Sequence, residues 1–190
     1  MFNGNNSLAI SHWFHDYVVS PIYWDLVPPQ DVPPNISRNF VDYINDFHTH
    51  GYKVWNINNR LHATSTIRVK KQSDERRWAL VSGRADYLIT KQNADRANYL
   101  AEMLGVIEIQ SGQKSESKCI DQLLWYLFIY MNTKHLLNLV GFLVLSDGRC
   151  KAFKATRDEN NECVYEVNGY FNVCHIATVF NDIYSRHNYG

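Results

Sequence analysis

The sequence predicts an α/β protein, classed more finely as α+β, with a central mixed β-sheet flanked by helices. Apolar residues recur at helical spacing from Ile36 to Phe47, and a second, longer helical pattern runs from Glu116 to about Thr133. Short apolar runs rich in β-branched residues, such as 105–109 and 139–145, are typical of buried strands. The length of 190 residues suits a single core. We therefore expect one domain over residues 36–190.

Residues 1–35 are predicted to form an irregular N-terminal arm. They begin with an Asn- and Gly-rich stretch, continue through an aromatic cluster that includes Trp13 and Trp24, and end with two Pro-Pro pairs. Paired prolines forbid a continuous helix because proline lacks the amide donor and restricts the preceding residue. We expect this arm to pack on the domain through its aromatic side chains.

The charge and cysteine content exclude some classes of protein. The 19 basic and 19 acidic residues give zero net charge, so the chain as a whole carries no electrostatic signature of a protein that coats DNA. Nucleic-acid binding would need a local basic patch. The four cysteines are widely spaced, with no C-x-x-C pair typical of zinc sites. No run of about 18 apolar residues occurs, so we expect a soluble, intracellular protein, with the nucleus as one option if the source is eukaryotic.

The first predicted helix starts at Ile36 and stops before Gly51. Asp42, Asp46 and His48 on this helix are weak candidates for an additional metal ligand, and a solvated polar face is the commoner explanation.

Strands are predicted next at 53–57, 63–69 and 78–82. The best basic patch in the chain lies around the turn between the last two, and comprises Arg68, Lys70, Lys71, Arg76 and Arg77. It is interpreted as a phosphate-contacting hairpin, as part of a nuclear-import signal, or as a charged hairpin tip that keeps a sheet edge soluble.

Two carboxylates stand in unusual places. Asp86 leads into an apolar run that ends near Lys91, and Glu108 is embedded in the run Gly105–Gln110. An ionised carboxylate in a buried strand is costly unless it is paired or binds a metal ion. If the two residues lie on adjacent strands at one edge, their oxygens form a site suited to Mg²⁺ or Mn²⁺.

The remaining elements follow the same reasoning. Residues 91–99 form a polar break, and the helix from Glu116 places Gln122 and Tyr126 on one face because they are four residues apart. A central strand is predicted at 139–145, a turn with an Asp-Gly signature at 146–149, strands at 150–156 and 163–167, and a closing helix at 174–187.

The ordered set Gly83-Arg84-Ala85-Asp86, Ile107-Glu108-Ile109-Gln110 and Gln122-x-x-x-Tyr126 resembles the PD-(D/E)xK nuclease superfamily. The helix is most similar to those of RecB-like exonucleases, type I restriction nuclease domains and Crinkler-type effector nuclease domains. The resemblance covers roughly residues 83–154 and implies a restriction-endonuclease-like core. Ala85 replaces the usual proline, and Gln110 stands where the superfamily has lysine. A neutral amide supplies no positive charge to the reacting phosphate. Lys114, four residues on, is a candidate to reach back into the site.

The resemblance implies metal-dependent hydrolysis of DNA, with RNA as the alternative nucleic-acid partner. It implies no organic cofactor and no membrane partner, and it is compatible with a homodimeric protein. Asp86 and Glu108, with the Ile109 carbonyl, would hold Mg²⁺ or Mn²⁺, Gln110 would orient water, and Gln122 and Tyr126 would support the ligands or contact the substrate. Substrate would also meet Lys114 and the basic hairpin. Two alternatives stay open: a degenerate nuclease fold that acts as a nucleic-acid- or protein-binding effector module, and an α/β protein whose carboxylates pair with arginines such as Arg84.

Overall fold

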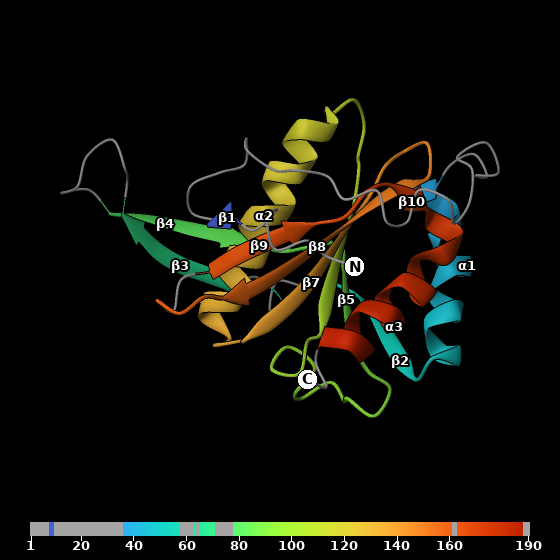
Figure 1. The fold of residues 1–190 in the computed structure, drawn as a ribbon, viewed down its shortest axis with the longest axis horizontal. Coiled ribbons are helices and arrows are strands. Elements are labelled where there is room, and N and C mark those ends of the chain that lie inside the picture. Colours follow the sequence, from blue (N-terminus) through green and yellow to red (C-terminus); the bar gives the residue numbers. More distant parts are fainter. Residues whose placement is uncertain are drawn as a thin grey trace.

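The computed structural model describes residues 8–9, 36–57, 63, 65–70, 78–160 and 163–187 (Figure 1). In chain order the elements are β1 (Leu8–Ala9), α1 (Ile36–Thr49), β2 (Tyr52–Asn56), β3 (Ser65–Lys70), β4 (Trp78–Gly83), β5 (Tyr87–Lys91), β6 (Gly105–Ile109), α2 (Glu116–Thr133), β7 (Asn138–Val144), β8 (Arg149–Arg157), β9 (Cys163–Val167), β10 (Phe171–Asn172), a 3-10 turn (Val173–His175) and α3 (Ile176–His187).

A mixed β-sheet forms the centre of the described structure, as the sequence predicts. Its strand order is β1-β9-β8-β7-β6-β5-β2, and β10 pairs with β8 off this path. The β6–β7 pair is parallel, whereas the other pairs of this sheet are antiparallel. The parallel pair requires a crossover, which α2 supplies between the two strands.

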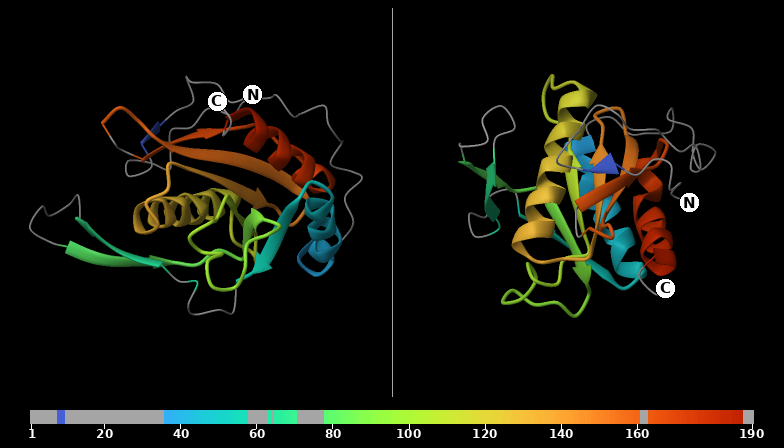
Figure 2. Two further views of the ribbon diagram at one scale, coloured as in Figure 1. Left: turned by 90° about the horizontal axis from the view of Figure 1, so that it is seen from below. Right: turned by 60° about the vertical axis from the view of Figure 1, so that its left-hand side comes forward.

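Helices cover both faces of this sheet, which both views of Figure 2 show. The face under α2 holds one apolar cluster, which contains Leu123, Leu127 and Leu143. The opposite face, under α1 and α3, holds a second cluster around Phe47, Phe142 and Phe180. The strands between them are buried on both sides, which explains why 105–109 and 139–145 read as continuous apolar runs.

Strands β3 and β4 form a separate two-stranded antiparallel ribbon that projects from the rest of the fold (Figures 1 and 2). The hairpin predicted from the sequence is therefore present, but it does not belong to the main sheet. The ribbon lies against α2 at its base. Its basic tip, residues 71–77, lies outside the described residues.

Most predicted elements agree with the structure to within one or two residues. α2 has the predicted limits, and its Ser115 side chain accepts a hydrogen bond from the Lys118 N–H at 3.3 Å, which caps the helix start. The turn after β7 contains Gly148 with φ of 87°, a left-handed conformation that glycine adopts without strain. The closing helix starts at Ile176, two residues later than predicted, because a 3-10 turn precedes it.

Short strands were missed by the sequence pattern. β10 has two residues, and β1 is a two-residue segment of the N-terminal arm that pairs with β9. Segments this short carry no periodicity. Among the helices of the described residues, none combines the length and apolar character needed to cross a bilayer.

Candidate functional site

Asp86 and Glu108 lie side by side at one edge of the sheet. Strands β5 and β6 are antiparallel, with Tyr87 opposite Ile107, so Asp86 stands opposite Glu108 one step beyond the last paired residue. The Ile109 N–H donates to Asp86 Oδ2 at 2.9 Å, and the Asp86 carbonyl accepts from the Ile57 N–H at 3.0 Å. Backbone contacts from both neighbouring strands therefore fix Asp86 in place.

Both carboxyls are on the sheet face that α2 covers. Val106 and Leu88 pack in the α2 cluster, and residues two apart on a strand share a face. The helix that carries Gln122 and Tyr126 therefore covers the same sheet face as the two carboxyls. The structure thus brings together the three sequence segments that carry the resemblance.

Burial changes the protonation of this pair. The Glu108 side chain is only 8% exposed, and desolvation followed by repulsion from Asp86 raises its pKa to about 8. Burial also raises the pKa of Asp86, opposed by its hydrogen bond from Ile109 and by the charges of Lys114 and Arg84. Near neutral pH the raised pKa therefore favours a protonated Glu108 in the metal-free protein.

One oxygen of the pair remains without a partner. Glu108 Oε2 is buried and has no hydrogen bond among the described residues. Within the same ranges, neither Asp86 nor Glu108 forms an ion pair with a lysine or arginine, Arg84 included. No ion pair among the described residues therefore supports the alternative in which arginines pair with these carboxyls.

The donor set fits a hard divalent cation with several retained waters. The oxygens available are those of Asp86 and Glu108, together with the Ile109 carbonyl that the sequence predicts as a ligand. Carboxylate and carbonyl oxygens suit Mg²⁺, which typically keeps part of its hydration shell. Within the described ranges, no group of three or more Asp, Glu, His or Cys side chains gathers where a metal ion could be held.

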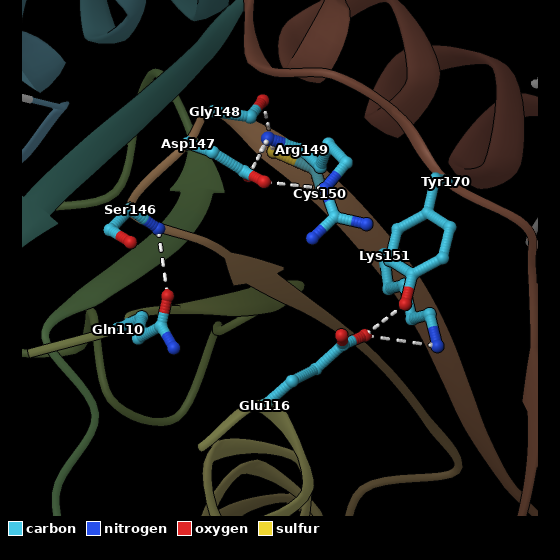
Figure 3. Close-up of polar contacts among 9 residues, drawn as sticks. All are labelled: Gln110, Glu116, Ser146, Asp147, Gly148, Arg149, Cys150, Lys151 and Tyr170. Atoms are coloured by element: carbon cyan, nitrogen blue, oxygen red, sulfur yellow. Dashed lines mark hydrogen bonds and ion pairs between the residues drawn. The ribbon is translucent and has the colours of Figure 1, made fainter. Parts of the chain in front are cut away.

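Gln110 has both ends of its amide bonded to the backbone. Oε1 accepts from the Ser146 N–H at 2.9 Å, which Figure 3 shows, and Nε2 donates to the Lys114 carbonyl at 2.6 Å. The side chain braces the segment after β6 against the turn after β7. This bracing role was not predicted from the sequence.

Lys114 is the cation that acts on the two carboxyls. Its charge opposes the burial that raises the pKa of Asp86 and of Glu108. Its ammonium donates to Gln122 Oε1 at 2.8 Å, and Gln122 Nε2 in turn donates to the Tyr126 hydroxyl. A positive charge therefore approaches the site from the turn that Gln110 braces.

Tyr126 packs closely against the end of the ribbon. A Cβ atom placed on Gly83 would lie 2.4 Å from Tyr126 Cδ1, well inside van der Waals contact. Glycine in the Gly83-Arg84-Ala85-Asp86 segment therefore has a steric reason. It lets the chain pass beneath Tyr126 before Asp86 enters the site.

Other predicted residues lie elsewhere or outside the description. Of the basic patch, Lys70 is described only as the last residue of β3, while Lys71, Arg76 and Arg77 lie outside the described residues. Asp46 and His48 are exposed on α1, which covers the opposite face of the sheet from α2. The Asp42 side chain also lies outside the description.

A second polar cluster, which was not predicted from the sequence, lies at the same end of the sheet (Figure 3). Lys151, with a side chain only 3% exposed, pairs with Glu116 Oε1 at 3.2 Å, and the Tyr170 hydroxyl donates to the same oxygen. Asp147 and Arg149 form an ion pair at 2.7 Å. Lys151 inside a strand of buried residues is the same kind of signal as Glu108 and was available in the sequence.

Two neighbouring hollows lined by described residues lie away from this edge. One, of about 430 Å³, is bordered by Lys91, Glu102 and Tyr184, and its neighbour shares Lys91 and Tyr184. Lys91 ends β5, whereas Asp86 precedes its start, so the hollows and the carboxyls are at opposite ends of this strand.

Comparison with known proteins finds no matching family model, no matching curated protein and no matching solved structure.

Proposed function

We propose that this protein is a metal-dependent phosphodiesterase that hydrolyses DNA, built on a restriction-endonuclease-like core. The observation that carries the proposal is the meeting of Asp86 and Glu108 on adjacent strands, with one buried Glu108 oxygen unpartnered. A buried carboxyl oxygen without a hydrogen-bond partner is costly, and a bound cation would supply a partner and stabilise the ionised form. The order strand-Asp, strand-Glu, helix with Gln and Tyr supports the same assignment.

Asp86, Glu108 and the Ile109 carbonyl would hold Mg²⁺ or Mn²⁺. When bound, the ion would polarise the phosphoryl group and lower the pKa of a bound water. The chain's own contribution is to keep the two carboxyls in register through the Ile109 and Ile57 contacts, and to limit competing solvent by burial. No covalent enzyme intermediate is needed for this hydrolysis.

Lys114 takes the position of the missing motif lysine in this proposal. Its charge acts on both carboxyls, and Gln122 holds its ammonium. An ammonium beside the reacting phosphate would stabilise the charge that develops on the phosphoryl oxygens. Gln110 would serve indirectly, by holding the Lys114 backbone in place.

The test is nicking of a supercoiled plasmid with Mg²⁺ or Mn²⁺. Asp86→Asn and Glu108→Gln should each abolish nicking, and Lys114→Gln should reduce it about 100-fold, as expected for losing one electrostatic contact. Lys91→Gln, the same charge change at the other end of β5, should have no effect. Nicking that survives Asp86→Asn, or no nicking by the wild type in either metal, would refute the hydrolytic proposal.

A second candidate function is a nuclease-like fold that binds nucleic acid or protein without turnover. Two observations favour it: the Gln110 amide is occupied by backbone partners, and no group of three metal-binding side chains is found in the described residues. DNA binding that is unaffected by metal, together with the absence of nicking, would support this candidate.

A further inference from the structure

We propose that Arg149, held in place by Tyr170 and Asp147, binds a backbone phosphate of the nucleic-acid substrate beside the Asp86–Glu108 pair. The inference rests on the proposed function for its substrate class. Arg149 lies outside the predicted site, in the polar cluster drawn in Figure 3.

Within the described ranges, the Arg149 guanidinium is hydrogen-bonded through Nε but not through its two terminal nitrogens. Nε donates to Asp147 Oδ2 at 2.7 Å, and the Arg149 backbone N–H donates to Asp147 Oδ1 at 3.0 Å. Figure 3 shows no dashed line from the two terminal nitrogens, and no hydrogen bond joins them to any described residue. The side chain is 34% exposed, so a ligand can reach these nitrogens.

The Tyr170 ring supports this guanidinium. The Arg149 Cζ atom lies 4.7 Å from the ring centroid, a cation–π distance. The ring is itself held, because its hydroxyl donates to Glu116 and because the Lys151 ammonium also lies against it, at 4.3 Å. Each polar group that surrounds the guanidinium thus has a partner, and the terminal nitrogens of Arg149 are left to bind something else.

A phosphate oxyanion is the ligand that suits this arrangement. A guanidinium offers two parallel N–H groups that match two oxygens of a phosphate, and fixing it in advance reduces the entropy lost on binding. Asp147 and Glu116 balance the charges of Arg149 and Lys151. The cluster therefore favours a ligand that makes directed hydrogen bonds over one attracted by net charge alone.

The register places Arg149 on the same side of the sheet as the carboxyl pair. Glu108 is opposite Leu143, and Leu143 is opposite Lys151, two residues after Arg149. Two strand spacings and two residue steps correspond to about 12 Å between the Glu108 and Arg149 backbones. A strand with one phosphate about every 3.4 Å of helix axis covers that distance in three or four nucleotides. One bound strand can therefore reach both places.

The experiment measures binding of a fluorescein-labelled short DNA duplex by anisotropy, without divalent metal, over a series of KCl concentrations. Arg149→Gln should weaken binding about 10-fold and reduce the slope of log K against log salt by about 0.9, the value for one lost phosphate contact. Arg149→Lys should keep most of the slope, because the charge remains, while losing affinity with the two-pronged contact. Arg96→Gln is the matched control and should behave as wild type, since Arg96 follows the end of β5 farthest from Asp86.

Outcomes separate this inference from the proposed function. An unchanged salt slope for Arg149→Gln, even with weaker binding or a lower melting temperature, would mean a structural role and overturn the inference. An equal loss in Arg96→Gln, or a wild type that does not bind duplex, would also overturn it. A reduced slope in Arg149→Gln alongside a wild type that never nicks DNA would support the phosphate site and refute hydrolysis.

Discussion

A Glu108→Gln substitution should flatten the pH dependence of the free energy of unfolding of the metal-free protein. Burial and Asp86 raise the pKa of Glu108 from 4.5 to about 8 in the folded state. Between those two values only the folded protein holds this proton, so stability is fully present below the lower value and is lost as pH rises through the upper one. Glutamine keeps a neutral hydrogen-bond donor at every pH, so the variant lacks this titration.

The magnitude follows from the proton linkage. Each pH unit inside the window costs about 1.4 kcal/mol, so the whole window amounts to at most about 5 kcal/mol. From about pH 5.5 to about pH 7.5 the wild type should lose up to about 2.7 kcal/mol more than the variant. For a domain of this size that equals a difference of roughly 5–10 °C in melting temperature.

The assay is thermal or urea unfolding of both proteins in EDTA across this pH range. At each pH the free energy of unfolding of Glu108→Gln is subtracted from that of the wild type. This subtraction removes the contributions of the groups whose titration the substitution leaves unchanged. Parallel curves for the two proteins would refute a folded-state pKa of Glu108 that is raised by burial.

Millimolar Mn²⁺ extends the test. Metal binding needs the ionised carboxylates, so Mn²⁺ should raise the wild-type melting temperature, and more at alkaline than at acidic pH. Glu108→Ala should remove the Mn²⁺ effect. A variant that responds to Mn²⁺ as the wild type does would place the metal elsewhere.

Three further predictions concern Gly83, Gln110 and the basic segment between β3 and β4. Gly83→Ala should lower the free energy of unfolding by about 1–3 kcal/mol, because the added methyl group meets the Tyr126 ring, and unchanged stability in urea unfolding would contradict this contact. Gln110→Ala and Gln110→Lys should each reduce plasmid nicking about 10- to 1000-fold, because neither side chain can accept from the Ser146 N–H while holding the Lys114 carbonyl, and wild-type nicking by both variants would contradict this bracing role. Neutralising Arg76 and Arg77 together should weaken duplex binding and reduce the salt slope by up to about 1.8 in anisotropy titrations, whereas wild-type behaviour would leave the hairpin tip as a solubilising feature.

Much of the secondary structure was predictable because its signals are local. The spacing of Ile36, Phe40, Ile44 and Phe47 predicts α1, and the apolar stripe from Ile120 to Met131 predicts α2. The apolar run of β6 marks Glu108 as anomalous without any structural knowledge. These patterns are local because a buried helix face requires apolar residues on successive turns, and a buried strand face requires them at alternate positions.

Only part of the candidate site could be predicted from the sequence. Asp86 and Glu108 are identifiable as a pair, since both are carboxylates in or beside buried strands, and the structure places them opposite one another. Gln110 is different. The residues near Gln110 in the sequence do not indicate that Ser146, in the turn after β7, donates its backbone N–H to the Gln110 side chain.

Local patterns in the chain were enough to predict the order and type of the main elements and to mark two carboxyls as unusual. The departure of β3 and β4 from the main sheet, the approach of Lys114 to the carboxyls, and the meeting of Glu116, Arg149 and Tyr170 became known from the folded structure alone. The physical reason is that periodicity records which side of an element is buried, but not which distant element covers it. Side-chain partners more than a few residues apart are fixed by strand register and helix placement, and these arise only when the whole core packs.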